Sequence, residues 1–342
     1  MAAGVEPAGD GSPRGLISAG PGGAAGYVGR MDQPPKPPRV AYLGPEGTFT
    51  EEVLLTQPDL AAGELVPLGS MPDVLFAVQE GAADLGVVAV ENAIEGTVNI
   101  AVDTLAFDVD LLVQRELVLP VHMNLMAPAG TAIEQVERIH SIPVAWAQCH
   151  RWLRAYAASA VPAPASSTAE AARLAQQSSD GRTAAIANAR AAEVYGLEVL
   201  ASGIEDHPEN QTRFAVVARE GVPAPTGHDK SSIVVFQKAD APGSLLAILQ
   251  EFAARSINLS LLLSRPTKHR LGDYCFVIDL DGHVADEVVA DCLRALKEKQ
   301  ADVKFLGSYP AAGAAGEARR AERDVATVEA AAWVEALRSQ IS

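Results

Sequence analysis

Three short polar clusters combine side chains that enzymes use to bind and protonate a small molecule. Residues 44–50 read Gly-Pro-Glu-Gly-Thr-Phe-Thr, so two hydroxyls follow a turn bracketed by glycines. Glu91 and Asn92 set a carboxylate and an amide at the end of an apolar run, and residues 210–214 read Asn-Gln-Thr-Arg-Phe. Positioned hydroxyls and carboxylates donate or accept protons, and a guanidinium binds a carboxylate through two parallel hydrogen bonds. The clusters indicate a site for a small anionic substrate.

Each cluster also has a structural interpretation that the sequence leaves open. Residues 44–50 are equally typical of a turn that leads into a helix capped by Thr48. Glu91 or Asn92 can cap the turn that follows, and Arg213 can form an ion pair with a nearby acid. In the last cluster, apolar residues 215–217 come directly after the polar ones. That order favours a site over a solvated loop.

Helix starts offer a second way to bind an anion. Capping patterns of the Ser/Thr-x-x-acid type begin at Thr48, Ser70 and Ser167. Each helix start presents unpaired N–H groups and the positive end of the helix dipole, which together attract carboxylates. Most capping patterns serve only their own helix, so these support an anion site modestly.

The sequence contains no motif for a nucleotide site, a serine nucleophile or a metal site. It holds no P-loop, no G-x-G-x-x-G and no G-x-S-x-G, and its seven histidines do not pair at ligand spacing. We therefore expect no metal and no cofactor. Three cysteines and an N-terminus without the apolar core of a signal peptide predict free thiols in a cytoplasmic protein.

The elements that must position the clusters alternate between strands and helices from residue 40 to 218, which indicates an α/β region with mostly parallel sheets. Residues 219–230 form a Pro/Gly-rich linker. Residues 231–310 then follow the order βαββαβ, which is typical of a ferredoxin-like module. We expect residues 1–38 to be a disordered extension and residues 311–342 to be an Ala-rich tail.

The charge of the chain is concentrated in its α/β region. The 342 residues carry 27 Lys and Arg against 43 Asp and Glu, a net charge of −16. Residues 40–218 alone hold eight arginines, no lysine and 23 acids. Nucleic acids and anionic membranes bind basic surfaces, so we expect neither as a partner. Anionic substrates of this region must be held by a few arginines, hydroxyls and backbone N–H groups.

The polar clusters, in this order and ahead of a ferredoxin-like module, resemble prephenate dehydratase. The resemblance rests on residues 42–49, on Val90-Glu91-Asn92 with Glu95-Gly96, on Gln148-Cys149 and on the Thr-Arg-Phe signature within residues 210–214. Residues 231–310 resemble an ACT domain, the phenylalanine-sensing part of this family. The chain departs from the family pattern at Ala93, where serine is common, and at Leu263, where many members carry glutamate.

The resemblance implies a fold and a domain plan. The fold is a two-lobed, periplasmic-binding-protein-like catalytic domain over 40–218, followed by the ACT domain over 231–310. Lobe 1 would comprise about 40–115 and 203–218, and lobe 2 about 116–202. Because residues 1–38 are too short for the helical chorismate mutase domain that some members carry, we expect a monofunctional enzyme.

The resemblance also implies roles for individual residues. Thr212 would donate a hydrogen bond to the leaving hydroxide, with Glu91 as a hypothetical relay, and Arg213 would bind a substrate carboxylate. Further substrate contacts would come from Thr48, Phe49, Thr50, Asn92, Gln148, Ser167, Thr168, Asn210, Gln211 and Phe214. Phenylalanine would bind where two ACT domains meet, near Gly243, Ser244, Leu245, Asn258, Leu259, Ser264 and Arg265.

These roles predict decarboxylating dehydration of prephenate to phenylpyruvate in phenylalanine biosynthesis, with feedback by phenylalanine. Paired ACT domains bury sheet edges and predict a homodimer or homotetramer. An arogenate dehydratase is the nearest alternative, since its substrate differs only by an amino group in place of a keto group. A non-catalytic protein that senses amino acids or binds solutes is a more distant one.

Overall fold

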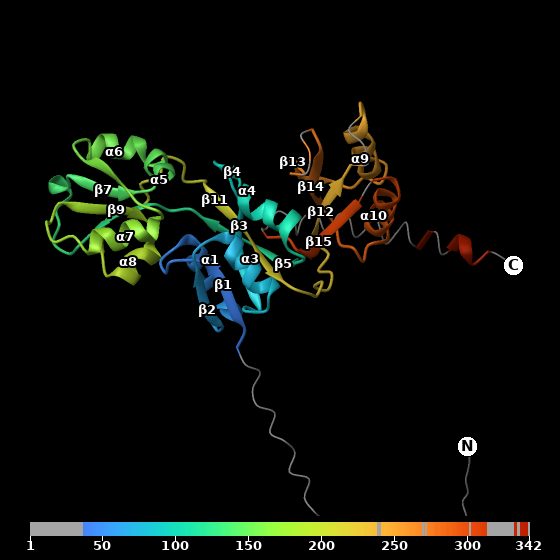
Figure 1. Cartoon of the computed structure of the whole chain (residues 1–342), viewed down its shortest axis with the longest axis horizontal. Coiled ribbons are helices and arrows are strands. Elements are labelled where there is room, and N and C mark those ends of the chain that lie inside the picture. Colours follow the sequence, from blue (N-terminus) through green and yellow to red (C-terminus); the bar gives the residue numbers. More distant parts are fainter. Residues whose placement is uncertain are drawn as a thin grey trace, which may run out of the picture. The chain divides into compact units, whose positions relative to one another are not determined.

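The computed structural model describes residues 37–237, 241–268, 270, 272–300, 302–312, 332–333 and 336–340. Most of the predicted extension and tail, 1–38 and 311–342, therefore lies outside the described residues. The described part contains three sheets, and Figure 1 labels most of their strands and helices.

The first sheet has the strand order β2-β1-β3-β11-β5, with the short β4 beside β3. Strands β1, β2 and β3 pair in parallel, whereas β11 runs antiparallel between β3 and β5. The strands are β1 (Arg39–Leu43), β2 (Glu64–Leu68), β3 (Leu85–Asn92), β4 (Gly96–Thr97), β5 (Leu112–Pro120) and β11 (Gln211–Ala218). The helices are α1 (Phe49–Leu55), α2 (Pro58–Ala61), α3 (Met71–Gln79), α4 (Asn99–Asp103) and the π-helix η1 (Thr104–Asp108).

Alternate residues of each strand in this sheet pack into different cores, as the two-residue period of a strand requires. Phe214 and Val216 join the core that contains residues of α1 and α2. Ala215 and Val217 join the core on the other face, with residues of α3 and α4. Strand β11 is therefore buried on both faces.

The second sheet has the order β10-β6-β9-β7-β8 and also carries helices on both faces. The central strand β9 reads Thr-Ala-Ala-Ile-Ala and is buried at every position. The strands are β6 (Asn124–Ala127), β7 (Arg138–Ser141), β8 (Val161–Pro164), β9 (Thr183–Ala187) and β10 (Glu198–Ala201). The helices are the 3₁₀ turn η2 (Ile133–Gln135), α5 (Pro143–Gln148), α6 (His150–Tyr156), α7 (Thr168–Gln176) and α8 (Ala189–Tyr195).

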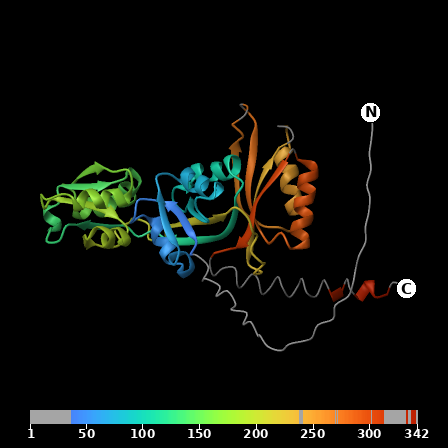
Figure 2. The same cartoon turned by 60° about the horizontal axis from the view of Figure 1, so that its bottom comes forward.

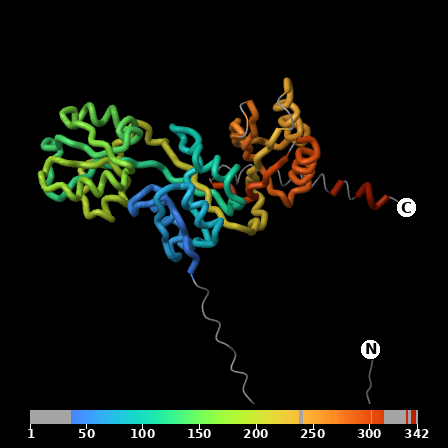
Figure 3. The backbone as a smooth tube through the Cα atoms, in the orientation of Figure 1, coloured from blue at the N-terminus to red at the C-terminus, as the bar shows by residue number. Residues whose placement is uncertain are grey.

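The chain passes from the first sheet to the second after β5 and returns before β11. The tube in Figure 3 shows these two crossings, and they are joined by a 2.8 Å hydrogen bond from Val121 N to Asn210 O. The second sheet is thus an insertion within the first. The two-lobed α/β fold predicted from the sequence is confirmed. The prediction of mostly parallel sheets is wrong: both sheets are mixed, because β11 returns antiparallel between β3 and β5, and β6 pairs antiparallel with β9 and β10.

The C-terminal unit (residues 229–310) has an antiparallel sheet of order β13-β14-β12-β15. Figure 2 shows its two helices side by side on one face of this sheet. Its element order confirms the predicted βαββαβ plan: β12 (Asp229–Phe236), α9 (Ser244–Ala253), β13 (Leu259–Pro266), β14 (Tyr274–Asp281), α10 (Glu287–Lys299) and β15 (Asp302–Pro310).

The other face of this sheet packs against the first lobe. Val102 and Ala106 share a core with residues of β12, β14 and β15. Strand β15 also approaches β5 closely: a Cβ at Gly307, whose φ is +135°, would lie 2.6 Å from the Val113 carbonyl oxygen. Since only glycine has no Cβ and tolerates this φ, Gly307 is what allows the close approach.

Candidate functional site

The Thr-Arg-Phe signature lies on β11, where its residues pair across to the end of β3. Thr212 is opposite Asn92, and Arg213 is opposite Glu91. Successive side chains on a strand point to opposite faces, so these two pairs lie on different sides of the sheet. The structure therefore groups Thr212 with Asn92, and it does not bring Thr212 together with Glu91.

A hydrogen-bond network holds Asn92 and Thr212 in place. The Asn92 side-chain Nδ2 donates to Thr212 Oγ1 at 3.0 Å. Asn92 Oδ1 accepts the backbone N–H groups of Ile94 and Glu95, both at 3.0 Å. Because the oxygen of the amide is fixed by two donors, its NH₂ group must face the threonine. Asn92 thus caps the following turn and also contacts Thr212.

A second network joins the two lobes beside the first. Gln148, at the end of α5, donates from Nε2 to Glu95 Oε1 at 3.1 Å, and its Oε1 accepts from Asn210 Nδ2 at 3.2 Å. Asn210 is 1% exposed, and its Oδ1 has no partner among the described residues. A buried acceptor without a partner is costly, so this oxygen is suited to meet a ligand.

The turn at residues 44–50 performs its structural role. The Thr48 hydroxyl accepts from Glu51 N at 3.4 Å and donates to Leu43 O at 2.9 Å, so both of its functions are used in capping α1. Phe49 packs against cores of both lobes. Thr50 is 5% exposed and makes no side-chain hydrogen bond to a described residue, which leaves its hydroxyl for a ligand.

Lobe 2 contributes the start of α7. Ser167 caps this helix and accepts from Glu170 N at 3.0 Å. Thr168 is buried and, like Thr50, has no side-chain hydrogen bond to a described residue. Gln211 is exposed at the start of β11, and its carbonyl accepts from Ala93 N at 2.9 Å. Hydroxyls, amides and a helix start thus make up the predicted substrate contacts.

The remaining residues of the signature lie away from this network. Arg213 Nε donates to Glu91 Oε2 at 3.0 Å, and its Nη1 contacts Asp279 at 2.8 Å and Glu116 at 3.4 Å. Burial alone would lower the pKa of Arg213, but the attraction of the surrounding acids outweighs it and raises that pKa above its ordinary value. Phe214 is 1% exposed and belongs to the core of the first lobe. Of the two roles open to Arg213, the structure displays the ion pair.

Comparisons with known proteins show the family of the chain. The family model described as prephenate dehydratase matches residues 40–222, and the ACT domain model matches residues 231–298. A protein of Mycolicibacterium vanbaalenii named prephenate dehydratase is 41% identical over 316 residues, which cover 88% of this chain and 98% of that protein. The chain belongs to the prephenate dehydratase family.

Two solved structures resemble the chain over most of its length. A prephenate dehydratase of Arthrobacter aurescens, described as a complex with L-Phe, is 38% identical with a TM-score of 0.76, and the match covers 88% of this chain and 99% of that one. A protein described as a novel type of quorum-quenching acylase is 25% identical with a TM-score of 0.71, over 80% of this chain and 98% of that one. Since the fold serves both, chemistry must be argued from the site.

Sequence reasoning did not single out Glu95 as a residue of the candidate site. Glu95 lies in the segment that carries the resemblance, yet it was not among the predicted site residues. Its carboxylate accepts from Gln148, and its backbone N–H binds Asn92, so it links the two networks. Its position within the Glu-Gly pair next to Asn92 was the available signal.

The predicted effector residues divide into two groups. A pocket of about 590 Å³ in the C-terminal unit is lined by Gln237, Ala241, Gly243, Ser244, Leu245, Leu246, Leu249, Ser264, Tyr274 and Phe276. Asn258, Leu259 and Arg265 lie outside it. Asn258 donates to Asp281, Leu259 packs on the core of the unit, and Arg265 binds Asp103 and Asn99 of α4.

Other kinds of site find no support in the described part of the chain. It has no group of three or more His, Cys, Asp or Glu residues that could hold a metal ion. Cys149 is fully buried, which raises the pKa of its thiol to about 12 and keeps it from acting as a nucleophile. Across these same residues, the structure contains no helix long and apolar enough to cross a membrane.

Proposed function

We propose that the chain converts prephenate to phenylpyruvate, losing CO₂ and water, as a step of phenylalanine biosynthesis. The observation that carries the proposal is the contact between Asn92 and Thr212 at the junction of the lobes, within the part of the chain that matches the family. The substrate supplies the driving force, because its ring becomes aromatic. The enzyme must align the dianion and provide a donor for the departing hydroxide.

Thr212 is that donor. Its oxygen already accepts a hydrogen bond from Asn92, so its own proton is free to be donated to the leaving oxygen. A threonine hydroxyl is too weak an acid to act through its pKa alone. It works instead as a positioned donor whose hydrogen bond strengthens as negative charge develops on the departing oxygen.

The substrate is held mainly by neutral groups. The start of α7 and the unpaired hydroxyls of Thr50 and Thr168 bind its carboxylates. The only donor on prephenate is its ring hydroxyl, and the buried, unpartnered Asn210 Oδ1 is suited to accept from it. Gln148 of the second lobe fixes Asn210 and also contacts Glu95, so the acceptor for the ring hydroxyl depends on a contact between the lobes.

The same enzyme is inhibited by L-phenylalanine bound in the pocket of the C-terminal unit. Ser244 and Ser264 supply polar groups there, and Leu245, Leu249 and Phe276 supply an apolar wall for a benzyl group. The Arthrobacter aurescens relative is described as a complex with L-Phe, which supports this assignment. Two such units pair in a homodimer or homotetramer, and the protein works in the cytoplasm.

The test is a spectrophotometric assay of phenylpyruvate formation from prephenate, with and without L-phenylalanine. A parallel incubation with arogenate, in which the phenylalanine formed is measured by chromatography, separates the nearest alternative. Turnover of prephenate that L-phenylalanine suppresses is the expected result. A chain that binds L-phenylalanine but converts neither substrate would instead be a sensor.

A further inference from the structure

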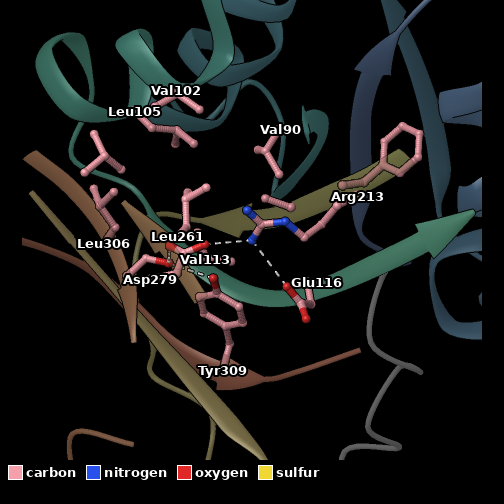
Figure 4. Close-up of a pocket in the computed structure, with 14 residues that line it drawn as sticks. Val90, Val102, Leu105, Val113, Glu116, Arg213, Leu261, Asp279, Leu306 and Tyr309 are labelled. Carbon is pink, nitrogen blue, oxygen red and sulfur yellow. Dashed lines mark hydrogen bonds and ion pairs between the residues drawn. The ribbon is translucent and has the colours of Figure 1, made fainter. Parts of the chain in front are cut away.

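A buried cluster of charges joins the catalytic strand to the C-terminal unit. The side chain of Arg213 is 16% exposed, and its partners Glu116 and Asp279 are only 3% and 6% exposed. Figure 4 shows the guanidinium of Arg213 directed at both carboxylates from β11. Lys230 adds a second cation, 2.9 Å from Glu116. Buried charges are stable only with partners, so removing any of them is costly.

Asp279 is itself held firmly. Its Oδ2 contacts Arg213, while its Oδ1 accepts from Ser232 Oγ at 2.5 Å. Ser232 also hydrogen bonds to the Tyr309 hydroxyl at 2.7 Å, and burial raises the pKa of Tyr309 well above its ordinary value, so the phenol stays neutral. Each carboxylate oxygen of Asp279 thus has a partner, which fixes the position it offers to Arg213.

Arg213 is the neighbour of Thr212 on β11, so contacts that hold Arg213 also constrain the backbone at Thr212. The pairing of β11 with β3 shifts register between Arg213 and Phe214. Irregularities of this kind redirect side chains near active sites and depend on surrounding contacts for their geometry. Arg213 also binds Glu91, the residue before Asn92. Both members of the Asn92–Thr212 contact therefore adjoin a residue of the charge cluster.

Strand β14 connects this cluster with the effector pocket. Tyr274 and Phe276 line the pocket, whereas Val277 and Asp279 face the first lobe. Strand β13 repeats the pattern: Ser264 lines the pocket and Arg265 binds Asp103 of α4. One face of each strand thus meets the effector and the other meets the catalytic lobe.

We propose that Asp279 is a positioning residue for the dehydration, acting through Arg213 to hold Thr212 against the substrate. The inference rests on the proposed function. It assigns to the C-terminal unit a part in catalysis even without effector, and it gives Arg213 a supporting role behind the site. Because Asp279 and the effector pocket share β14, binding of L-phenylalanine reaches Thr212 by the same route.

The experiment compares Asp279→Asn with Asp291→Asn in the full chain. Asp291 is an exposed acid of α10 that pairs with Arg255 and Arg294, within the same unit and away from the first lobe. We expect Asp279→Asn to lower kcat about 10- to 100-fold, as misplacement of a catalytic group does, with KM changed less than about twofold. Asp291→Asn should keep wild-type kinetics, and both variants should bind L-phenylalanine in calorimetry.

A double-mutant cycle with Arg213→Gln gives the sharper test. If Asp279 acts through Arg213, the double variant is no slower than the slower single variant, because each change removes the same support. Asp279→Glu, which keeps the charge, should recover part of the lost kcat. Should Asp279→Asn fail to fold, Ser232→Ala removes only one hydrogen bond from the carboxylate and should lower kcat to a smaller extent.

Three results would overturn the role of Asp279: wild-type kcat in a folded Asp279→Asn, a loss confined to KM, or losses that multiply in the double variant. If the wild-type chain converts prephenate and any of these three results is found, the positioning role of Asp279 is refuted and the proposed function stands. A wild-type chain that converts no prephenate refutes the proposed function, and this inference with it.

Discussion

On one face of β11, Thr212 contacts the neutral amide of Asn92, while on the other face Arg213 contacts three carboxylates. On the neutral side, no residue that the structure describes accepts the proton of the Thr212 hydroxyl, so this proton is available to a ligand. On the charged side, separating Arg213 from its carboxylates is costly, because it would leave buried charges without partners. The two faces of β11 therefore suit different tasks. Thr212 can donate a hydrogen bond to a ligand, whereas the ion pairs of Arg213 can hold the strand in place.

The largest effect should come from the neutral face. Thr212→Ala removes the donor to the leaving oxygen, so we expect kcat to fall about 10²- to 10⁴-fold with little change in KM. Thr212→Ser, which keeps the hydroxyl, should retain most of the activity. Thr56→Ala, at an exposed position after α1, is the matched control. Steady-state kinetics with prephenate measure all three, and unchanged kcat in Thr212→Ala would remove this residue from the mechanism.

A negative charge at position 92 should remove the difference between the neutral and the charged face of β11. In Asn92→Asp, the carboxylate accepts the proton of Thr212 instead of donating to its oxygen, so the substrate loses its donor. We expect kcat to fall about 10- to 100-fold, which corresponds to roughly 1–3 kcal/mol for one misdirected hydrogen bond. The same kinetic assay measures it. A variant as fast as wild type would mean that the direction of this hydrogen bond is irrelevant.

A separate group of ion pairs, formed by Asp103 of α4 with Arg265 and Lys268, should appear in the acid stability of the protein. Burial opposes the ionisation of Asp103, but hydrogen bonds from Arg265 and Lys268 outweigh it and lower the pKa of Asp103 below its ordinary value. The pair therefore stabilises the fold above the ordinary aspartate pKa, near 4, and this stability is lost as the pH falls through the lowered value.

The variant Asp103→Asn tests this direction of the change in stability with pH. We expect the variant to lose about 1–3 kcal/mol of unfolding free energy at pH 7 and less at pH 3, where the wild-type pair is itself weakened. Chemical denaturation at the two pH values measures the difference. An equal loss at both would show that the charge of Asp103 contributes nothing.

Added salt should have the smallest effect. The catalytic region has no lysine and an excess of acids, so long-range attraction does not draw in the dianion. Screening should raise kcat/KM slightly, by less than about twofold between roughly 0.05 and 0.5 M NaCl. A steep fall of kcat/KM with salt would mean that a cation attracts the substrate, which contradicts binding by the neutral face.

How much of this was visible in the sequence depends on the range of the contact. The α/β region and the βαββαβ unit follow from local apolar patterns, and capping by Thr48 and Ser167 follows from residues three positions apart. The two-lobed plan follows only from the family resemblance. Opposite faces for Thr212 and Arg213 could also have been inferred, because side chains alternate along any strand. The pairing of Asn92 with Thr212 depends on strand register, and that of Arg213 with Asp279 on the packing of two units. Neither of these two contacts produces a local pattern in the amino-acid sequence.

The insertion of the second lobe ahead of β11 has a consequence for biosynthesis. In the sheet that the structure describes, β11 lies between β3 and β5, so the first lobe lacks this inner strand until residues 211–218 have been synthesised. The second sheet is complete with β10 and can fold earlier on the ribosome. Arg213 then enters the sheet before Asp279 exists. For that interval a buried cation has only the acids of its own lobe as partners, and the last contact of the catalytic strand awaits the C-terminal unit.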